Sequence, residues 1–578
     1  MNPPLELVFL WHMHQPDYRD HRDGEFVLPW VYLHALKDYT DMAAHLERHP
    51  QIRAVVNFVP VLLDQIEDYV AQFESGQFRD PLLRLLATPD QVRLSNAERE
   101  FLLHACFRSN HTTMLAPFPR YQRLHDLYRS LTHEGETALA YLSDTYFTDL
   151  ATWYHLAWTG ESARRHRPML AELMSKGEGY TFDDRQALLD LIGEELRTLM
   201  PRYRTLAKSG QVEISSTPHT HPLSPLLLDF KVARETQPDT PLPFAACYPG
   251  GRTRVAAQID AARASHASRF DVPPVGMWPA EGAVSAAFVK QMAEHGCRWL
   301  ASGEGVLRAS LAHGGVGDSR AAYKPWRLES APGLTLFFRD ERLSDLIGFE
   351  YAKWHGQDAA RHFVAELEAI HAATPAGERA VVSVIMDGEN AWEHYPYNGH
   401  YFFEDLYTQL EAHTNIHTTT FAELLSRENP LPSAPLPCLT AGSWVFGTLS
   451  TWIGDADKNR AWDLLCSAKQ SYDQVMAGER LNEAERTAAT AQLAICESSD
   501  WFWWFGDYNP AAAVASFDRL YRRNLANLYQ LLHLPSPIQL ETPISSSGQG
   551  DQQHTNGHAR QADQGSGTMR RAQEQPHP

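Results

Sequence analysis

The chain has 578 residues, of which 43% are hydrophobic and 21% are charged, as is typical of soluble globular proteins with two or three domains. Its formal net charge of −20 argues against a nucleic-acid partner or an anionic membrane surface, because phosphate binding requires a basic face. No window reaches the roughly 18 uninterrupted apolar residues of a membrane span, and the N-terminal MNPPLELVFLWHMHQP lacks the basic start of a signal peptide. The six cysteines form no CxxC pair, which predicts reduced thiols in a cytoplasmic protein.

The first 80 residues alternate between strand and helix patterns. Residues 5–11 (LELVFLW) and 52–60 predict strands, and each is followed by a helical pattern, over 29–49 and 61–74. This alternation is typical of parallel β/α architecture. From about residue 80 to 208 the pattern is helical and charged, which predicts a helical insertion into the β/α domain.

The alternation resumes after the insertion. Further strands are predicted at 211–215, 273–279, 297–302, 334–340 and 380–386. About seven strands in all predict a distorted (β/α)7 barrel over residues 1–427. The segment 428–437 holds four prolines in ten residues and is interpreted as a linker. An α-helical domain is expected over 438–540, and the polar, low-complexity tail 541–578 is expected to be disordered.

Reactive residues of a β/α barrel are expected where its strands end. His12 and His14 follow the first strand and, two residues apart, share one face. They could bind a metal, donate to substrate hydroxyls or be ordinary core histidines. Residues 210–227 supply Glu213, His219 and His221, which taken alone fit a solvated loop.

Two carboxylates stand at the ends of other predicted strands. Glu281 lies in WPAEG, where small neighbours allow a ligand to approach and Trp278 offers a ring to a sugar; a helix N-terminus is the alternative. Asp387 ends the strand VVSVIM and is followed by Glu389 and Trp392; a helix N-cap is the alternative there. A pair of carboxylates flanked by aromatic rings is the arrangement that glycosidases use.

The C-terminal half adds aromatic residues beside acids. SWVFGTLSTWIGDADKNRAW (443–462) contains Trp444 and Trp452, and ESSDWFWWFGDYNP (497–510) contains Asp500 and Trp501. Helical cores favour Leu and Ala, so we interpret these rings as a carbohydrate-binding platform.

Taken together, HMHQP, GQVE…HP, WPAEG, DGENAWEHYP and SWVFGTLSTWIGDADKNRAW resemble the five ordered conserved regions of glycoside hydrolase family 57. The resemblance covers roughly residues 5–510. It implies a (β/α)7 barrel followed by an α-helical domain that completes the active site. It also implies an amylase, amylopullulanase, 4-α-glucanotransferase or branching enzyme that acts on α-glucans. HMHQP differs from the HGHxP form of branching enzymes, and His219 stands where amylopullulanase-like members have Tyr.

The resemblance implies roles for individual residues. Glu281 matches the catalytic nucleophile and Asp387 the general acid/base, while His12 and His14 match histidines that line the −1 sugar site. Glu213 matches the acid of the second region. The remaining residues expected to bind substrate are His221, Trp278, Trp392, Trp444, Trp452, Asp500 and Trp501.

These residues predict a retaining α-glucan hydrolase. Its two carboxyl groups should lie roughly 5–5.5 Å apart, and burial should raise the pKa of Asp387. The scheme requires no metal and no cofactor. A 4-α-glucanotransferase on the same site, a metal-dependent polysaccharide deacetylase and a glycan-binding protein are the alternatives.

Overall fold

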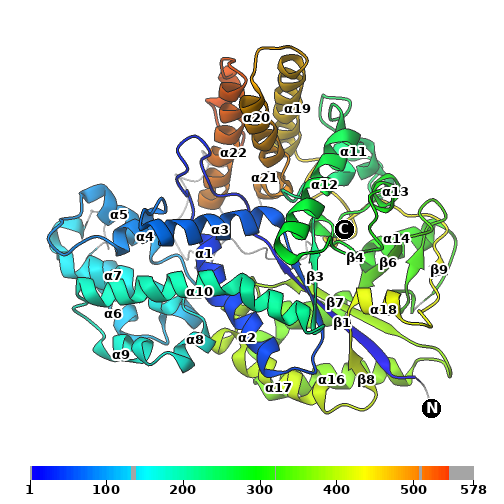
Figure 1. The fold of residues 1–578 in the computed structure, drawn as a ribbon, viewed down its shortest axis with the longest axis horizontal. Helices are drawn as coiled ribbons and strands as arrows, with labels where there is room; N and C mark the ends of the chain where they lie inside the picture. Colours follow the sequence, from blue (N-terminus) through cyan, green and yellow to red (C-terminus); the bar gives the residue numbers. More distant parts are fainter. Residues whose placement is uncertain (1–2, 132–137, 319, 507–508, 510, 546–578) are drawn as a thin grey trace.

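The computed structural model describes residues 3–131, 138–318, 320–506, 509 and 511–545. A barrel of mostly parallel strands lies at one side, helices of a long insertion extend from it at the left of Figure 1, and C-terminal helices stand above it. The predicted (β/α)7 barrel with a helical insertion and a C-terminal helical domain is therefore confirmed. No helix of the described residues combines the length and the hydrophobicity needed to cross a membrane.

Within the part of the chain that the structure describes, the barrel is built from seven parallel segments. Six are regular strands, and the seventh is reduced to one residue, Met277, which bridges Ser216 on one side and Leu300 on the other. Prolines at 273, 274 and 279 supply no backbone N–H, which explains why the strand predicted over 273–279 is so short. In order around the barrel, the regular strands are β3 (Val212–Ser216), β2 (Ala54–Phe58), β1 (Leu5–Met13), β7 (Val381–Asp387), β6 (Thr335–Arg339) and β4 (Trp299–Gly303).

Three short strands extend this sheet. β8 (Ile416–Thr418) pairs with the start of β1, and β5 (Trp326–Arg327) runs antiparallel to β6. β9 (Ala434–Pro435) pairs with β5. The proline-rich segment 428–437 therefore contributes a short strand to the sheet.

Alternate residues of the strands fill the barrel, as the two-residue period of a strand requires. At the amino ends of the strands the interior is closed by Phe421 and Leu424 of α18 (Phe421–Ser426). The interior side chains are Val8, Leu10, Val55, Trp278, Trp299, Ala301, Phe337, Val381 and Ile385.

Helices surround the barrel on its outside. The helix predicted over 29–49 is observed as α1 (Trp30–His34) and α2 (Thr40–Arg48), joined by a π-helical turn, η1 (Ala35–Tyr39). The other helices of the barrel are α3 (Pro60–Ser75), α11 (Ser224–Leu228), α12 (Gly251–Phe270), α13 (Ala286–Glu294), α14 (Glu304–His313), α15 (Glu341–Asp345), α16 (Gly356–Ala372) and α17 (His400–Glu411).

The insertion is helical and has well-defined helix starts. Capping boxes begin two of its helices, with Ser95 and Glu98 at α5 and Thr181 and Asp184 at α10, which satisfies their first backbone N–H groups. Its helices are α4 (Pro81–Leu86), α5 (Asn96–Ala105), α6 (Pro119–Leu131), α7 (Asp144–Ala157), α8 (Glu161–His166), α9 (Pro168–Lys176) and α10 (Phe182–Lys208).

The C-terminal helices pack on the barrel through a buried ion pair. Arg254 of α12 donates to both oxygens of Glu497, at 2.7 and 3.0 Å. These helices are α19 (Ala456–Met476), α20 (Glu483–Cys496), α21 (Ser499–Trp504) and α22 (Ala511–Leu531). The tail expected to be disordered begins with ordered residues, since Ile544 is buried and its N–H donates to Asp518; residues 546–578 lie outside the described part of the chain.

Candidate active site

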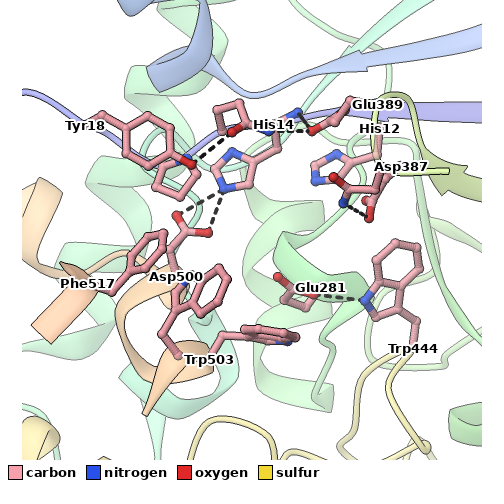
Figure 2. Close-up of a pocket in the computed structure, with 14 residues that line it drawn as sticks. His12, His14, Tyr18, Glu281, Asp387, Glu389, Trp444, Asp500, Trp503 and Phe517 are labelled. Carbon is pink, nitrogen blue, oxygen red and sulfur yellow. Dashed lines mark hydrogen bonds and ion pairs between the residues drawn. The ribbon is translucent and has the colours of Figure 1, made fainter. Parts of the chain in front are cut away.

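A pocket lies at the carboxyl ends of β1 and β7 and is covered by α21 and α22 (Figure 2). The pocket holds about 520 Å³ of empty space, including the solvent at its mouth. Four carboxyl groups, two histidines and several aromatic rings meet there. The lining residues are His12, His14, Gln15, Pro16, Tyr18, Glu281, Asp387, Glu389, Asn390, Trp444, Asp500, Trp503, Trp504 and Phe517.

Glu281 is held in a strained turn directly after the Met277 bridge. Its backbone is left-handed (φ 57°, ψ 23°), and only 2% of the residue is exposed. Gly282 must follow, because a Cβ there would lie 2.6 Å from the ring of Trp278. The Trp444 indole donates to Glu281 Oε2 at 2.9 Å, whereas Oε1 has no hydrogen-bond partner among the described residues. One oxygen is therefore fixed and the other is free to meet a ligand.

Asp387 enters the pocket from the last residue of β7. It pairs in register with His12 of β1, so both side chains point into the mouth of the barrel. Asn390 Nδ2 donates to Asp387 Oδ2 at 2.8 Å. Burial raises the pKa of Asp387 to about 6, against the opposing effects of Asn390 and Arg339. The group can therefore keep a proton nearly to neutral pH.

Glu281 and Asp387 influence each other's ionisation. Burial raises the pKa of Glu281 well above its ordinary value, and the negative charges of Asp387 and Asp500 raise it further. The hydrogen bond from Trp444 has the opposite effect, because it stabilises the ionised form of Glu281. Two acidic groups that share one pocket lose their protons in two separate steps, so the pair holds one proton over an intermediate pH range.

His12 and His14 are neutral hydrogen-bonding groups. Burial lowers the pKa of each imidazole to about 3. His12 Nδ1 donates to Asn57 Oδ1 at 2.7 Å, which leaves its Nε2 as an acceptor. His14 Nε2 donates to the Asp500 carboxylate at 2.9 Å. Groups of this kind suit sugar hydroxyls, which both donate and accept hydrogen bonds.

Asp500 is delivered to the pocket by the short helix α21. Ser498 caps this helix and donates to Asp500 Oδ2 at 2.6 Å. At the other end, the buried ammonium of Lys458 donates to the carbonyl oxygens of Phe502 and Phe505, at 2.7 and 2.6 Å. These carbonyls would otherwise end a helix without partners. Both ends of α21 are thus fixed, and with them the position of Asp500.

One group of residues could hold a metal ion. A nitrogen of His14, a nitrogen of His221 and a carboxylate oxygen of Asp500 all lie within 4.8 Å of one another, and all three residues are buried. The two imidazole rings stack with their centroids 3.8 Å apart. His14 Nδ1 and His221 Nε2 have no hydrogen-bond partner among the described residues. Two nitrogens and a carboxylate are a ligand set that zinc accepts.

Three tryptophans expected to bind substrate lie in the core instead. Trp392 donates to the Gly388 carbonyl and packs against Trp11 and Phe403, with 1% of it exposed. Trp452 and Trp501 are fully buried, and neither lines the pocket. Burial of these large rings stabilises the fold, and their positions do not support the expected contact with substrate.

Glu213 also lies away from the pocket. It stands near the start of β3 and therefore at the amino end of the barrel, where its carboxylate accepts from Trp299 Nε1 and from the backbone N–H of Ala422 at the start of α18, both at 2.8 Å. Its expected role in substrate binding is not supported by this position.

Two further predicted residues stand directly behind the pocket wall. Trp278 packs edge-on against Trp444, with ring centroids 5.2 Å apart, and His221 stacks on His14. Trp278 and His221 therefore contact the lining residues Trp444 and His14 but do not line the pocket themselves.

Several residues that line the pocket were not predicted from the sequence. Trp503 and Trp504 were overlooked in favour of Trp501, although residues three and four positions after Asp500 share its helix face. Glu389 follows Asp387 by two residues; its Oε1 accepts from Gln15 Nε2 at 3.1 Å, and its Oε2 has no hydrogen-bond partner in the described part of the chain. Tyr18 and Phe517 carry no local signal, because folding alone brings them together.

Comparison with known proteins gives a family and a fold. The sequence profile of glycosyl hydrolase family 57 matches residues 8–435. No match to the chain was found among functionally curated proteins. A branching enzyme from Thermococcus kodakaraensis has a similar structure (TM-score 0.57, 15% identity, covering 91% of this chain and 90% of that one).

Two further solved structures share the fold. They are the α-amylase AmyC from Thermotoga maritima (TM-score 0.52, 12% identity, covering 95% of this chain and 99% of that one) and the 4-α-glucanotransferase from Thermococcus litoralis (TM-score 0.50, 13% identity, covering 91% and 60%).

Proposed function

Because the chain belongs to glycosyl hydrolase family 57, we propose that it is a retaining enzyme acting on α-glucans, with Glu281 as nucleophile and Asp387 as general acid/base. The observation that carries this assignment concerns Glu281 Oε1, which has no hydrogen-bond partner within the described ranges of the chain. It lies in the same pocket as the Asp387 carboxyl group, whose pKa is raised to about 6. A retaining mechanism needs one carboxylate to attack and one acid to protonate.

In the first step Glu281 Oε1 attacks the anomeric carbon while Asp387 gives its proton to the departing glycosidic oxygen. The Trp444 indole donates to the other Glu281 oxygen at 2.9 Å and so orients the carboxylate before the reaction. Little conformational entropy of the Glu281 side chain is then lost when Oε1 attacks. The bond from carbon to the leaving oxygen breaks as the glycosyl–enzyme ester forms. Asp387 is then a carboxylate beside the ester.

In the second step Asp387 acts as the base. It takes a proton from water or from a sugar hydroxyl, whose oxygen attacks the anomeric carbon and releases Glu281. Attack by water gives hydrolysis, and attack by a sugar gives transfer. We propose hydrolysis as the main outcome, with 4-α-glucanotransfer on the same residues as the alternative.

The other lining residues hold the sugar in place. His12 and His14 are neutral, and together with Asp500 they offer hydrogen bonds to hydroxyl groups. Trp444 and Trp503 offer ring faces to the apolar side of a pyranose.

Incubation with maltoheptaose tests this function, with Glu281→Ala as the inactive control. We expect reducing ends to increase with the wild-type protein and not with the variant. Redistribution into longer and shorter chains at constant reducing ends would assign glucanotransfer. If the wild type and the variant leave maltoheptaose equally unchanged, the proposal is wrong.

The His14, His221 and Asp500 cluster supports a second candidate, a metal-dependent polysaccharide deacetylase. Treatment with EDTA separates the two candidates. The deacetylase would lose acetate release from an acetylated glycan on chelation and regain it with Zn²⁺. The retaining glucan enzyme would keep its activity on maltoheptaose at the same EDTA concentration.

A further inference from the structure

The two ends of the pocket differ in their exposure. Asp387, Asn390 and Trp444 at one end are half-buried. At the other end, the exposed fractions are 3% for Tyr18 and 4% for Phe517. Figure 2 shows these groups on opposite sides of the pocket, with Asp387 and Trp444 on one side and Tyr18, Asp500 and Phe517 on the other. The pocket is therefore open near Asp387 and closed near Phe517.

The chemistry assigns each end to a part of the substrate. The general acid protonates the oxygen of the departing chain, so the leaving part of the glucan lies on the side of Asp387. The retained glycon, which becomes bonded to Glu281, lies on the side away from it. Asp500 stands on that second side (Figure 2). The closed end is thus the end that receives the glycon.

The closed end is a packed wall from three separate parts of the chain. Trp504 of α21 stacks on Phe517 of α22 with ring centroids 4.2 Å apart and planes 10° from parallel. The Tyr18 ring lies 6.3 Å from that of Phe517, and its backbone N–H donates to Gln65 of α3. Tyr18 OH donates to Gln15 Oε1, and Gln15 Nε2 donates to Glu389. Among the described residues, these packed rings stand where a longer glycon would have to pass.

We infer that the enzyme acts from the non-reducing end of an α-glucan and that the wall formed by Tyr18, Trp504 and Phe517 limits the glycon to a short unit. This inference rests on the proposed function, because it uses the assignment of Glu281 and Asp387. It does not depend on whether water or a sugar resolves the glycosyl–enzyme.

A blocked substrate tests the inference on the wild-type protein. Maltoheptaose and maltoheptaose with a 4,6-O-benzylidene group on its non-reducing glucose are compared, and the products are resolved by chain length. We expect at least a 100-fold slower reaction of the blocked chain, and early products of the unblocked chain that have lost or gained only a short unit. Equal rates on both substrates, or early products cut in mid-chain, would overturn the inference and leave the proposed function standing. Inactivity on both would overturn the proposed function and this inference with it.

Phe517→Leu tests the wall directly. A smaller side chain should open the closed end, so the rate on the blocked chain should rise at least 10-fold relative to the unblocked chain. Phe147→Leu, a fully buried phenylalanine of α7 in the insertion, is the matched control and should leave this ratio unchanged. A folded Phe517→Leu protein with the wild-type ratio would contradict the wall. If Phe517→Leu does not fold, the comparison of blocked and unblocked maltoheptaose on the wild-type protein is the test of the inference.

Discussion

The two ends of the barrel hold glutamates in opposite situations. At the carboxyl end, Glu281 has one oxygen fixed by Trp444 and one without a partner in the described structure. At the amino end, both oxygens of Glu213 accept hydrogen bonds, from Trp299 and from the start of α18. Burial raises the pKa of both groups, well above its ordinary value for Glu281 and to about 7 for Glu213.

This comparison shows that a raised pKa alone does not identify a catalytic acid. Structural carboxyl groups are buried too, and their pKa rises for the same reason. The difference lies in the hydrogen bonds, because a satisfied carboxylate stabilises its surroundings whereas an unsatisfied one at a pocket is available to a ligand. Four substitutions sharpen or break this distinction.

Glu281→Gln should have the largest effect. It removes the attacking oxygen, and we expect activity on maltoheptaose to fall by roughly 10⁴-fold or more, since loss of a nucleophile can cost about 10⁶-fold in covalent catalysis. Thermal unfolding should confirm that the variant folds. Activity within 10-fold of the wild type would show that Glu281 is not the nucleophile.

Asp387→Ala should have a smaller effect that depends on the substrate. On maltoheptaose we expect a loss of about 10²–10⁴-fold, the contribution typical of general acid catalysis. On maltosyl fluoride the loss in the rate of glycosyl–enzyme formation should be far smaller, because fluoride departs without a proton. Equal losses on the two substrates would contradict the role of Asp387 as the acid.

Trp444→Phe should change the pH dependence more than the maximal rate. Removing the indole donor destabilises ionised Glu281 and raises its pKa, because a hydrogen bond to a charged group contributes about 1.5–3 kcal/mol. The acidic limb of the kcat/KM profile should therefore move to higher pH by about one unit or more. An unchanged limb would mean that Trp444 does not tune Glu281.

Glu213→Gln should leave activity within about 2-fold of the wild type and alter only stability. Folded Glu213 keeps its proton to about pH 7, against an ordinary value of 4.5, so the folded state binds more protons between these two pKa values. Stability should thus fall by roughly 2–3 kcal/mol as the pH rises across that window. The variant should lose this dependence in denaturant titrations at pH 4.5 and 7. A large rise in KM would instead show that Glu213 takes part in substrate binding.

Much of the fold could be predicted because strand and helix patterns alternate clearly along the chain. The seventh strand is reduced to the single residue Met277, because the surrounding prolines lack the backbone N–H groups that hydrogen bonds between strands require. The positions of Glu281 and Asp387 in the pocket could be predicted because both residues stand near the carboxyl ends of strands. Glu213 stands at the beginning of its strand, a position that already indicated the opposite end of the barrel.

The aromatic residues were harder to assign from sequence. Tryptophan serves both as core and as sugar-binding surface, so composition could not separate Trp392 and Trp501 from Trp503. Helical spacing from Asp500 gives the correct choice for Trp503. Phe517 and Tyr18 meet only through packing between distant parts of the chain, which no local pattern reports.

The most direct test of the account is to trap the glycosyl–enzyme and locate it. 5-Fluoro-α-D-glucosyl fluoride forms the ester readily and releases it slowly, so the label can be followed by intact mass and peptide mapping. We predict one glucosyl label per chain, on Glu281, absent from Glu281→Gln and longer-lived in Asp387→Ala. A label on Asp387, Glu389 or Asp500, or turnover with inversion of the anomeric configuration, would contradict the account.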